Sequence, residues 1–183
     1  AVAILPGRGR TFGAPVLLPV GDGPVDVALG DLTGDGLVDV VTANSQSDDL
    51  SIVLNQGAGA FAPETRVLAG NGPRRLLLAR LNGDVHLDLA AVHLESNDVR
   101  IWMGRGDGTF DPQSPIPTGN EPSGVAAADL NEDGRPDLVV ANAGPGTLSI
   151  LFGQADGTFA LERTQPLGLG GFTAPVLAAF NRD

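Results

Sequence analysis

Short apolar runs, many of them β-branched, alternate with turns rich in Gly, Asp and Asn along the whole chain. Runs of four to six residues bounded by such turns predict β-strands. No stretch repeats its apolar positions at helical spacing over three turns, so we expect an all-β chain. The first complete set of predicted strands covers residues 25–30, 38–43, 50–54 and 65–68.

The strand pattern repeats every 49 residues. Four phenylalanines mark this period, each close behind a Gly-containing turn: Phe12, Phe61, Phe110 and Phe159. A second phrase keeps the same step: Asp-Leu-Thr-Gly-Asp-Gly-Leu-Val-Asp begins at Asp31, and Asp-Leu-Asn-Glu-Asp-Gly-Arg-Pro-Asp begins at Asp129. A degenerate version, which begins at Arg80, stands midway between them.

Four strands in a repeat of this length are typical of a propeller blade. We therefore predict a β-propeller of four-stranded antiparallel blades, about 49 residues per blade, with nearly four blades in one repeat domain, residues 1–183. The expected divisions are a partial blade 1–20, blades 21–69, 70–118 and 119–167, and a partial blade 168–183.

The chain is out of phase with these blades. Residues 1–5 align with the third strand of a blade, residues 50–54, and Asp183 aligns with Asp133 inside the loop after a first strand. The two ends could complete one blade together, although its second strand would be missing. We favour a fragment of a longer protein, and a homo-oligomer that completes the ring is the next alternative.

Composition narrows the function classes. The net charge of −11 disfavours a nucleic-acid partner, because phosphate backbones would be repelled. The chain has no Cys, so it has neither disulfides nor thiol chemistry. Its longest apolar run is far shorter than a membrane span, and we expect no membrane insertion. The many carboxylates form either a solvated acidic surface or cation sites.

The aspartate phrases favour cation sites. Oxygen ligands at positions 1, 3, 5 and 9 of a tight loop, with a backbone carbonyl at position 7, suit Ca²⁺. In loop 1 (residues 31–39) the expected ligands are Asp31, Thr33, Asp35, Asp39 and the Leu37 carbonyl. In loop 3 (residues 129–137) they are Asp129, Asn131, Asp133, Asp137 and the Arg135 carbonyl.

The alternative is an Asp/Gly-rich hairpin turn without metal. A turn alone needs no aspartate at positions 1 and 9, so we prefer calcium for loops 1 and 3. An EF-hand is excluded, because neither loop has Glu at position 12 and strands rather than helices flank the loops.

Two further loops depart from the pattern. In loop 2 (residues 80–88) Arg80 replaces the first Asp and Val85 replaces the Gly, while Asn82, Asp84 and Asp88 remain. We predict no Ca²⁺ in loop 2, and the Arg80 guanidinium is the group that could stand in for the metal among these oxygens. In the last repeat Ala179 stands at position 1, followed by Asn181 and Asp183, and we expect no metal there.

These phrases carry a family resemblance. The segments 27–36, 106–110 and 137–142 resemble FG-GAP/VCBS repeats, which build the propellers of integrin α-subunits and of many bacterial surface proteins. The resemblance covers essentially the whole chain. It implies calcium loops between the first and second strands of a blade, a secreted or cell-surface location, and a role in adhesion, ligand binding or scaffolding.

We therefore expect a calcium-binding propeller module that binds an extracellular protein or glycan. The turns opposite the calcium loops are the candidate binding surface, and the alternative, which we prefer for these turns, is that they are simple solvated connections. The alternative is a purely structural module of a larger ring, and a hydrolase or lyase is the remote alternative. We predict no enzyme, because metal binding accounts for the aspartates and neither His86 nor His93 belongs to a recurring pattern. Trp102 is expected to fill space between blades.

Overall fold

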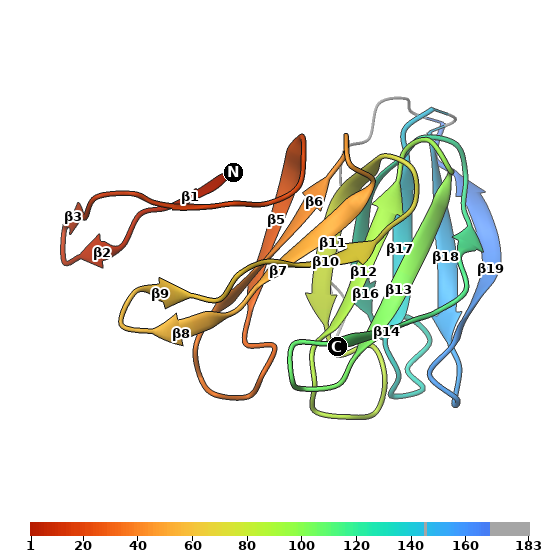
Figure 1. The fold of residues 1–183 in the computed structure, drawn as a ribbon. Coiled ribbons are helices and arrows are strands. Elements are labelled where there is room, and N and C mark those ends of the chain that lie inside the picture. Colours follow the sequence, from red (N-terminus) through yellow and green to blue (C-terminus); the bar gives the residue numbers. More distant parts are fainter. Residues whose placement is uncertain (145, 169–183) are drawn as a thin grey trace.

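The computed structural model describes residues 1–144 and 146–168. This part of the chain forms three main antiparallel sheets, which stand side by side (Figure 1). Blade 1 contains β5 (Pro24–Gly30), β6 (Asp39–Asn44), β7 (Asp49–Val53) and β10 (Thr65–Leu68). Blade 2 contains β11 (Pro73–Ala79), β12 (Asp88–His93), β13 (Asp98–Gly104), β14 (Phe110–Pro112) and β15 (Ile116–Pro117). Blade 3 contains β16 (Pro122–Ala128), β17 (Asp137–Asn142), β18 (Thr147–Gly153) and β19 (Phe159–Pro166).

Shorter strands accompany the blades. At the N-terminus β1 (Val2–Ile4) pairs with β4 (Val16–Leu18), and β2 (Gly7–Arg8) forms a hairpin with β3 (Thr11–Phe12). A similar hairpin of β8 (Asn55–Gly57) and β9 (Ala60–Phe61) extends from blade 1. The predicted all-β class and the four-stranded antiparallel design are confirmed. Within the described residues no helix is long and apolar enough to span a membrane.

The cores lie between the blades, because the second strand of each blade is apolar on both faces. In β12, whose residues are all buried, Leu89 and Ala91 pack in a cluster with blade 1. The alternate residues Ala90 and Val92 pack in a cluster with blade 3. Trp102 belongs to the cluster between blades 1 and 2, so it fills inter-blade space as predicted.

Three of the repeat phenylalanines also pack at interfaces, two between blades and one against the N-terminal strands. Phe159 packs between blades 3 and 2, Phe110 packs against the cluster between blades 2 and 1, and Phe61 packs against the N-terminal strands. Phe12 occupies the same repeat position but is 71% exposed, whereas Phe159 is 8% exposed. The repeat phenylalanine is therefore buried only where a preceding blade covers it.

Hydrogen bonds between blades recur at the end opposite the aspartate loops. The Gly72 N–H, just before β11, donates to Asp48 Oδ1 in blade 1 at 2.8 Å. The Glu121 N–H, just before β16, donates to Asn97 Oδ1 in blade 2 at 2.7 Å. Each bond ties the residue before the first strand of one blade to the turn between the second and third strands of the preceding blade.

Substitution of the repeat phenylalanine should cost more stability at the buried position, Phe159, than at the exposed position, Phe12. Phe159→Ala is expected to lower the free energy of unfolding by about 3–5 kcal/mol, because it leaves a cavity between blades. Phe12→Ala, the matched control, is expected to change it by less than about 0.5 kcal/mol. Urea denaturation followed by circular dichroism measures both. Equal losses for the two variants would contradict the inter-blade role.

Candidate metal-binding loops

Each aspartate loop connects the first and second strands of a blade: loop 1 joins β5 to β6, loop 2 joins β11 to β12, and loop 3 joins β16 to β17. The three loops lie at the same end of the blades as the turns that follow β13 and β18 (Figure 1). The loop from Ala179, in the last repeat, lies outside the described residues.

In loop 1 the first aspartate closes the turn around its own backbone. Asp31 Oδ1 accepts hydrogen bonds from the N–H groups of Thr33 and Gly34 at 3.2 and 2.8 Å, and Oδ2 accepts one from Gly36 at 2.8 Å. Asp35 Oδ1 accepts from the Leu37 N–H at 2.8 Å. The backbone thus curls around the Asp31 carboxylate.

Loop 3 is closed in the same way. Asp129 Oδ1 accepts from the Asp133 N–H at 3.2 Å, and Oδ2 accepts from Gly134 at 2.8 Å. Asp133 Oδ1 accepts from the Arg135 N–H at 2.9 Å, as Asp35 does from Leu37. One difference is that the Arg135 guanidinium also pairs with Asp133 Oδ2.

The two loops share their backbone shape as well. Positions 4 and 6 both have positive φ: 76° and 82° at Gly34 and Gly36, and 62° and 83° at Glu132 and Gly134. Glycine at position 6 adopts this conformation without strain, which explains why both loops have it there. In loop 2 neither position 4 nor position 6 has positive φ, so its backbone follows another path.

The role that we predicted for Arg80 is wrong. Its Nε–H donates to the Val85 carbonyl at 3.1 Å, and among the described residues no carboxylate forms an ion pair with it. Asp84 Oδ1 instead accepts from the His86 N–H at 2.8 Å. Arg80 is exposed, so water rather than a carboxylate of the loop solvates the rest of its guanidinium.

The ninth residue of every loop has a role that sequence reasoning missed. Each of these aspartates is the first residue of a second strand and is fully buried: Asp39, Asp88 and Asp137. In each case Oδ2 accepts from the backbone N–H of loop position 2 at 2.7–2.8 Å: Leu32, Leu81 and Leu130. Oδ1 accepts from a backbone N–H at the end of the third strand or just beyond it, at 2.8–2.9 Å: Asn55, Gly104 and Gly153.

We call this arrangement the aspartate clamp. It holds the loop to the end of the third strand, and it is present in loop 2 although that loop lacks the calcium pattern. The signal for it was the recurrence of Asp at position 9 even where Arg80 and Val85 break the motif. A carboxylate accepts up to about four hydrogen bonds, so a clamping aspartate in loops 1 and 3 keeps lone pairs for a cation.

The local environment sets the ionisation of the loop carboxylates. Hydrogen bonds, the strongest from the Gly36 N–H, hold the pKa of Asp31 below its ordinary value. Burial opposes ionisation of Asp133, but the Arg135 N–H, the Asn131 amide and the Arg135 charge together lower its pKa. Burial raises the pKa of the clamp residue Asp88, while the amides of Gly104 and Leu81 oppose that shift. Asp31 and Asp133 are therefore held as carboxylates, the form that binds cations.

In the described residues no three His, Cys, Asp or Glu side chains are gathered closely enough to hold a metal ion. The loop carboxylates face backbone N–H groups instead. Even so, the donor set of loop 1 fits calcium, because all its side-chain donors are oxygens and one of them lacks a partner. Thr33 Oγ1, at position 3, is buried without a hydrogen bond. A buried hydroxyl of this kind is costly unless something coordinates it.

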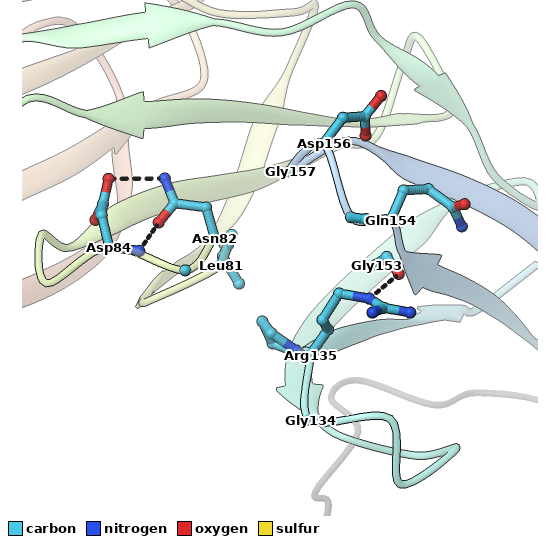
Figure 2. A pocket seen from close by; sticks show the side chains of 12 residues that line it. Leu81, Asn82, Asp84, Gly134, Arg135, Gly153, Gln154, Asp156 and Gly157 are labelled. Atoms are coloured by element: carbon cyan, nitrogen blue, oxygen red, sulfur yellow. Dashed lines mark hydrogen bonds between the residues drawn. The ribbon is translucent and has the colours of Figure 1, made fainter.

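A pocket of about 380 Å³ lies between loop 2, loop 3 and the turn after β18 (Figure 2). On one side Asn82 and Asp84 bond to each other; on the other, Arg135 Nε–H donates to the Gly153 carbonyl at 3.2 Å. Asp156 Oδ1 accepts from the N–H and hydroxyl of Thr158. These polar side chains already have partners, so we assign no ligand to this pocket.

Comparisons with known proteins agree with the repeat. Residues 31–91, 80–140 and 129–183 each match the family model described as an FG-GAP-like repeat. Each match begins at the first residue of one of the three loops. No curated protein matches the chain.

Solved structures share the fold. A protein from Lactobacillus plantarum is 23% identical, with a TM-score of 0.56 over 85% of this chain and 47% of that chain. The structure described as BBS1N in complex with ARL6DN, soaked with lead, is 16% identical, with a TM-score of 0.54 over 84% and 46%. At these identities the likeness shows the fold alone. The chain spans less than half the length of these two proteins.

The aspartate clamp is testable apart from any metal. Asp88→Asn is expected to lower the free energy of unfolding by about 1–3 kcal/mol, because the new amide NH₂ meets a backbone N–H that it cannot accept from. The loss should be the same in calcium and in EDTA. Asp84→Asn, in the exposed part of the same loop, is the control and should cost less than about 1 kcal/mol. A loss seen only in calcium would contradict the clamp.

Proposed function

The chain belongs to the FG-GAP-like repeat family, and on that premise we propose that it is a calcium-binding β-propeller module for extracellular ligand binding. The observation that carries the proposal is the shared design of loops 1 and 3. They have the same oxygen pattern, the same two positive-φ positions and the same hydrogen bond from the N–H of position 6 to the first aspartate, and loop 2 lacks all three features.

In this proposal loop 1 holds the cation through Asp31, Thr33, Asp35, Asp39 and the Leu37 carbonyl. Loop 3 holds it through Asp129, Asn131, Asp133, Asp137 and the Arg135 carbonyl. When bound, calcium neutralises carboxylates that otherwise repel one another within nine residues. The unpartnered Thr33 hydroxyl supports loop 1 in particular.

Loop 3 should bind more weakly than loop 1. The Arg135 guanidinium pairs with Asp133, a proposed ligand, and must release it before a cation binds. Loop 1 has Leu37 at this position, which offers no competing charge. The difference between the two loops therefore follows from one side chain.

The wider role rests on family resemblance. We propose a secreted or cell-surface location, where calcium reaches the concentrations that weaker sites need. We also propose a binding role in adhesion or scaffolding, toward a protein or glycan, rather than catalysis. The turns at the end opposite the calcium loops would carry the ligand, because a rigid scaffold presents them side by side (Figure 1).

Calcium should stabilise the module through loops 1 and 3. A ligand at a hundred times its Kd adds about 2.7 kcal/mol per site, so EDTA should lower the melting temperature by several degrees. Native mass spectrometry should count two bound ions, one in Asp31→Ala and one in Asp129→Ala. Arg135→Leu should tighten the weaker site. Asp84→Ala, in loop 2, is the control and should leave the ion count unchanged; a protein that binds no calcium would overturn the proposal.

A second candidate function is a structural module of a larger ring, and one observation favours it. On β5 the side chains of Val25, Val27 and Leu29 are 46%, 48% and 63% exposed. Residues of β5, β1 and their neighbours line an apolar cleft of about 390 Å³. The corresponding strands β11 and β16 pack against the first strand of a preceding blade. We propose that a further blade of the whole protein covers this face of β5.

The size of the protein in solution distinguishes a further blade from a second copy of the chain as the partner of this face of β5. Light scattering over a range of concentrations is expected to show concentration-dependent association of residues 1–183, because an apolar face is exposed to water. Val27→Glu should abolish this association, while Arg75→Glu on β11, the first strand of blade 2, should not. A closed assembly of fixed size would favour a second copy as the occupant, and a monomer at every concentration would contradict an uncovered face.

A further inference from the structure

Two clefts at the end opposite the calcium loops share part of their lining. A cleft of about 290 Å³ lies between blades 1 and 2, and one of about 410 Å³ lies between blades 2 and 3. Both are lined by Arg74 and Leu94. They occupy the same place in successive repeats: Arg74 in the second cleft corresponds to Val25 in the first, 49 residues earlier. Together the two clefts, which we call the groove, are lined by residues of all three blades, and Arg74 lines both of them.

The groove presents charges of both signs. Exposed Glu95 lines the cleft on one side of Arg74, and exposed Glu121 lines the cleft on the other side. In the described part of the chain, none of these three side chains has an oppositely charged group within 4.0 Å. Three exposed charges without partners, in the order acidic, basic, acidic, are free to pair with a ligand.

Glu121 occupies a strained backbone position. Its φ is 56°, and the two other repeats have glycine there, Gly23 at 62° and Gly72 at 64°. A left-handed conformation costs a non-glycine residue of the order of 1 kcal/mol or more, and such strain is characteristic of functional sites. The Glu121 backbone N–H donates to Asn97 Oδ1, and glycine would also make this bond, as Gly72 does to Asp48 in the preceding repeat. The carboxylate, not the backbone, distinguishes this repeat.

We propose that this groove binds an extended peptide segment with an acidic residue between two basic residues. The acidic residue pairs with Arg74, and the basic residues pair with Glu95 and Glu121. Arg suits this role because its planar guanidinium binds a carboxylate through two parallel hydrogen bonds. The small polar residues Ser45 and Gln46 and the apolar Leu94 complete a lining that accepts a peptide backbone and its side chains.

The lining favours a peptide over a glycan. No aromatic residue lines either cleft, and the chain has no Tyr. Trp102, its one Trp, is buried between blades. Aromatic rings are the usual platforms that combine an apolar face with a polar edge in recognition surfaces. The inference rests on the proposed function as a binding module, and it specifies the ligand of that module.

The test uses fluorescence anisotropy with two labelled peptides, Lys-Gly-Asp-Gly-Lys and the charge-inverted Asp-Gly-Lys-Gly-Asp. The first should bind residues 1–183, and the second should not. Arg74→Glu should weaken binding of the first peptide by about tenfold or more, because it replaces attraction by repulsion. Arg75→Glu is the matched control: it makes the same charge change on the same strand but lines neither cleft, and it should leave the affinity unchanged.

The variant Glu121→Gly tests whether the Glu121 carboxylate contributes to peptide binding rather than to folding. Glycine holds this backbone position in the other repeats, so the variant should keep or raise the melting temperature while it weakens peptide binding by several-fold. Unchanged affinity in Glu121→Gly or Arg74→Glu, equal affinity for both peptides, or retention of a neutral polysaccharide without peptide binding would each overturn the inference. The same protein is melted with and without calcium: stabilisation by calcium with no peptide binding defeats this inference alone.

Discussion

A buried aspartate at the start of each second strand is the contact on which the blade design depends. Its two oxygens accept backbone N–H groups from the preceding loop and from the end of the third strand. A buried carboxylate is costly unless fully hydrogen-bonded, so the loop and the third strand must stay in place to satisfy it. The clamp closes the turn without a metal. In loops 1 and 3 the oxygen pattern proposed to bind a cation therefore lies on a loop that the clamp already holds in shape.

Blade 2 departs from the repeat at both of its ends. At the loop end, Arg80 removes the first proposed calcium ligand. At the opposite end, His93 replaces the asparagine of the other blades and lies fully buried with Nδ1 2.8 Å from Asp98 Oδ1. Arg100 replaces a serine and donates to the Ala69 carbonyl at 3.0 Å. The shared apolar residues keep the blades packed, so the ends of the strands are free to change their chemistry.

The loops proposed to bind cations and the turns beside the proposed groove lie at opposite ends of the same strands (Figure 1). β11, for example, begins beside Arg74 and leads into loop 2, while β16 begins after Glu121 and leads into loop 3. Cations would thus stabilise one end of the blades while the other end presents side chains. The two proposals are therefore independent of each other, because no residue proposed for one site belongs to the other.

The sequence by itself determined the period, the strands and the three loops, because alternation, turn chemistry and ligand spacing are local properties of nearby residues. Predicted and observed strands of blade 1 agree to within one residue. It did not reveal the clamp, which joins Asp39 to Asn55, or the place of the Arg80 guanidinium. Only the tertiary structure decided these contacts and the groove around Arg74. They depend on how strands from distant parts of the chain pack, and no local pattern encodes that geometry.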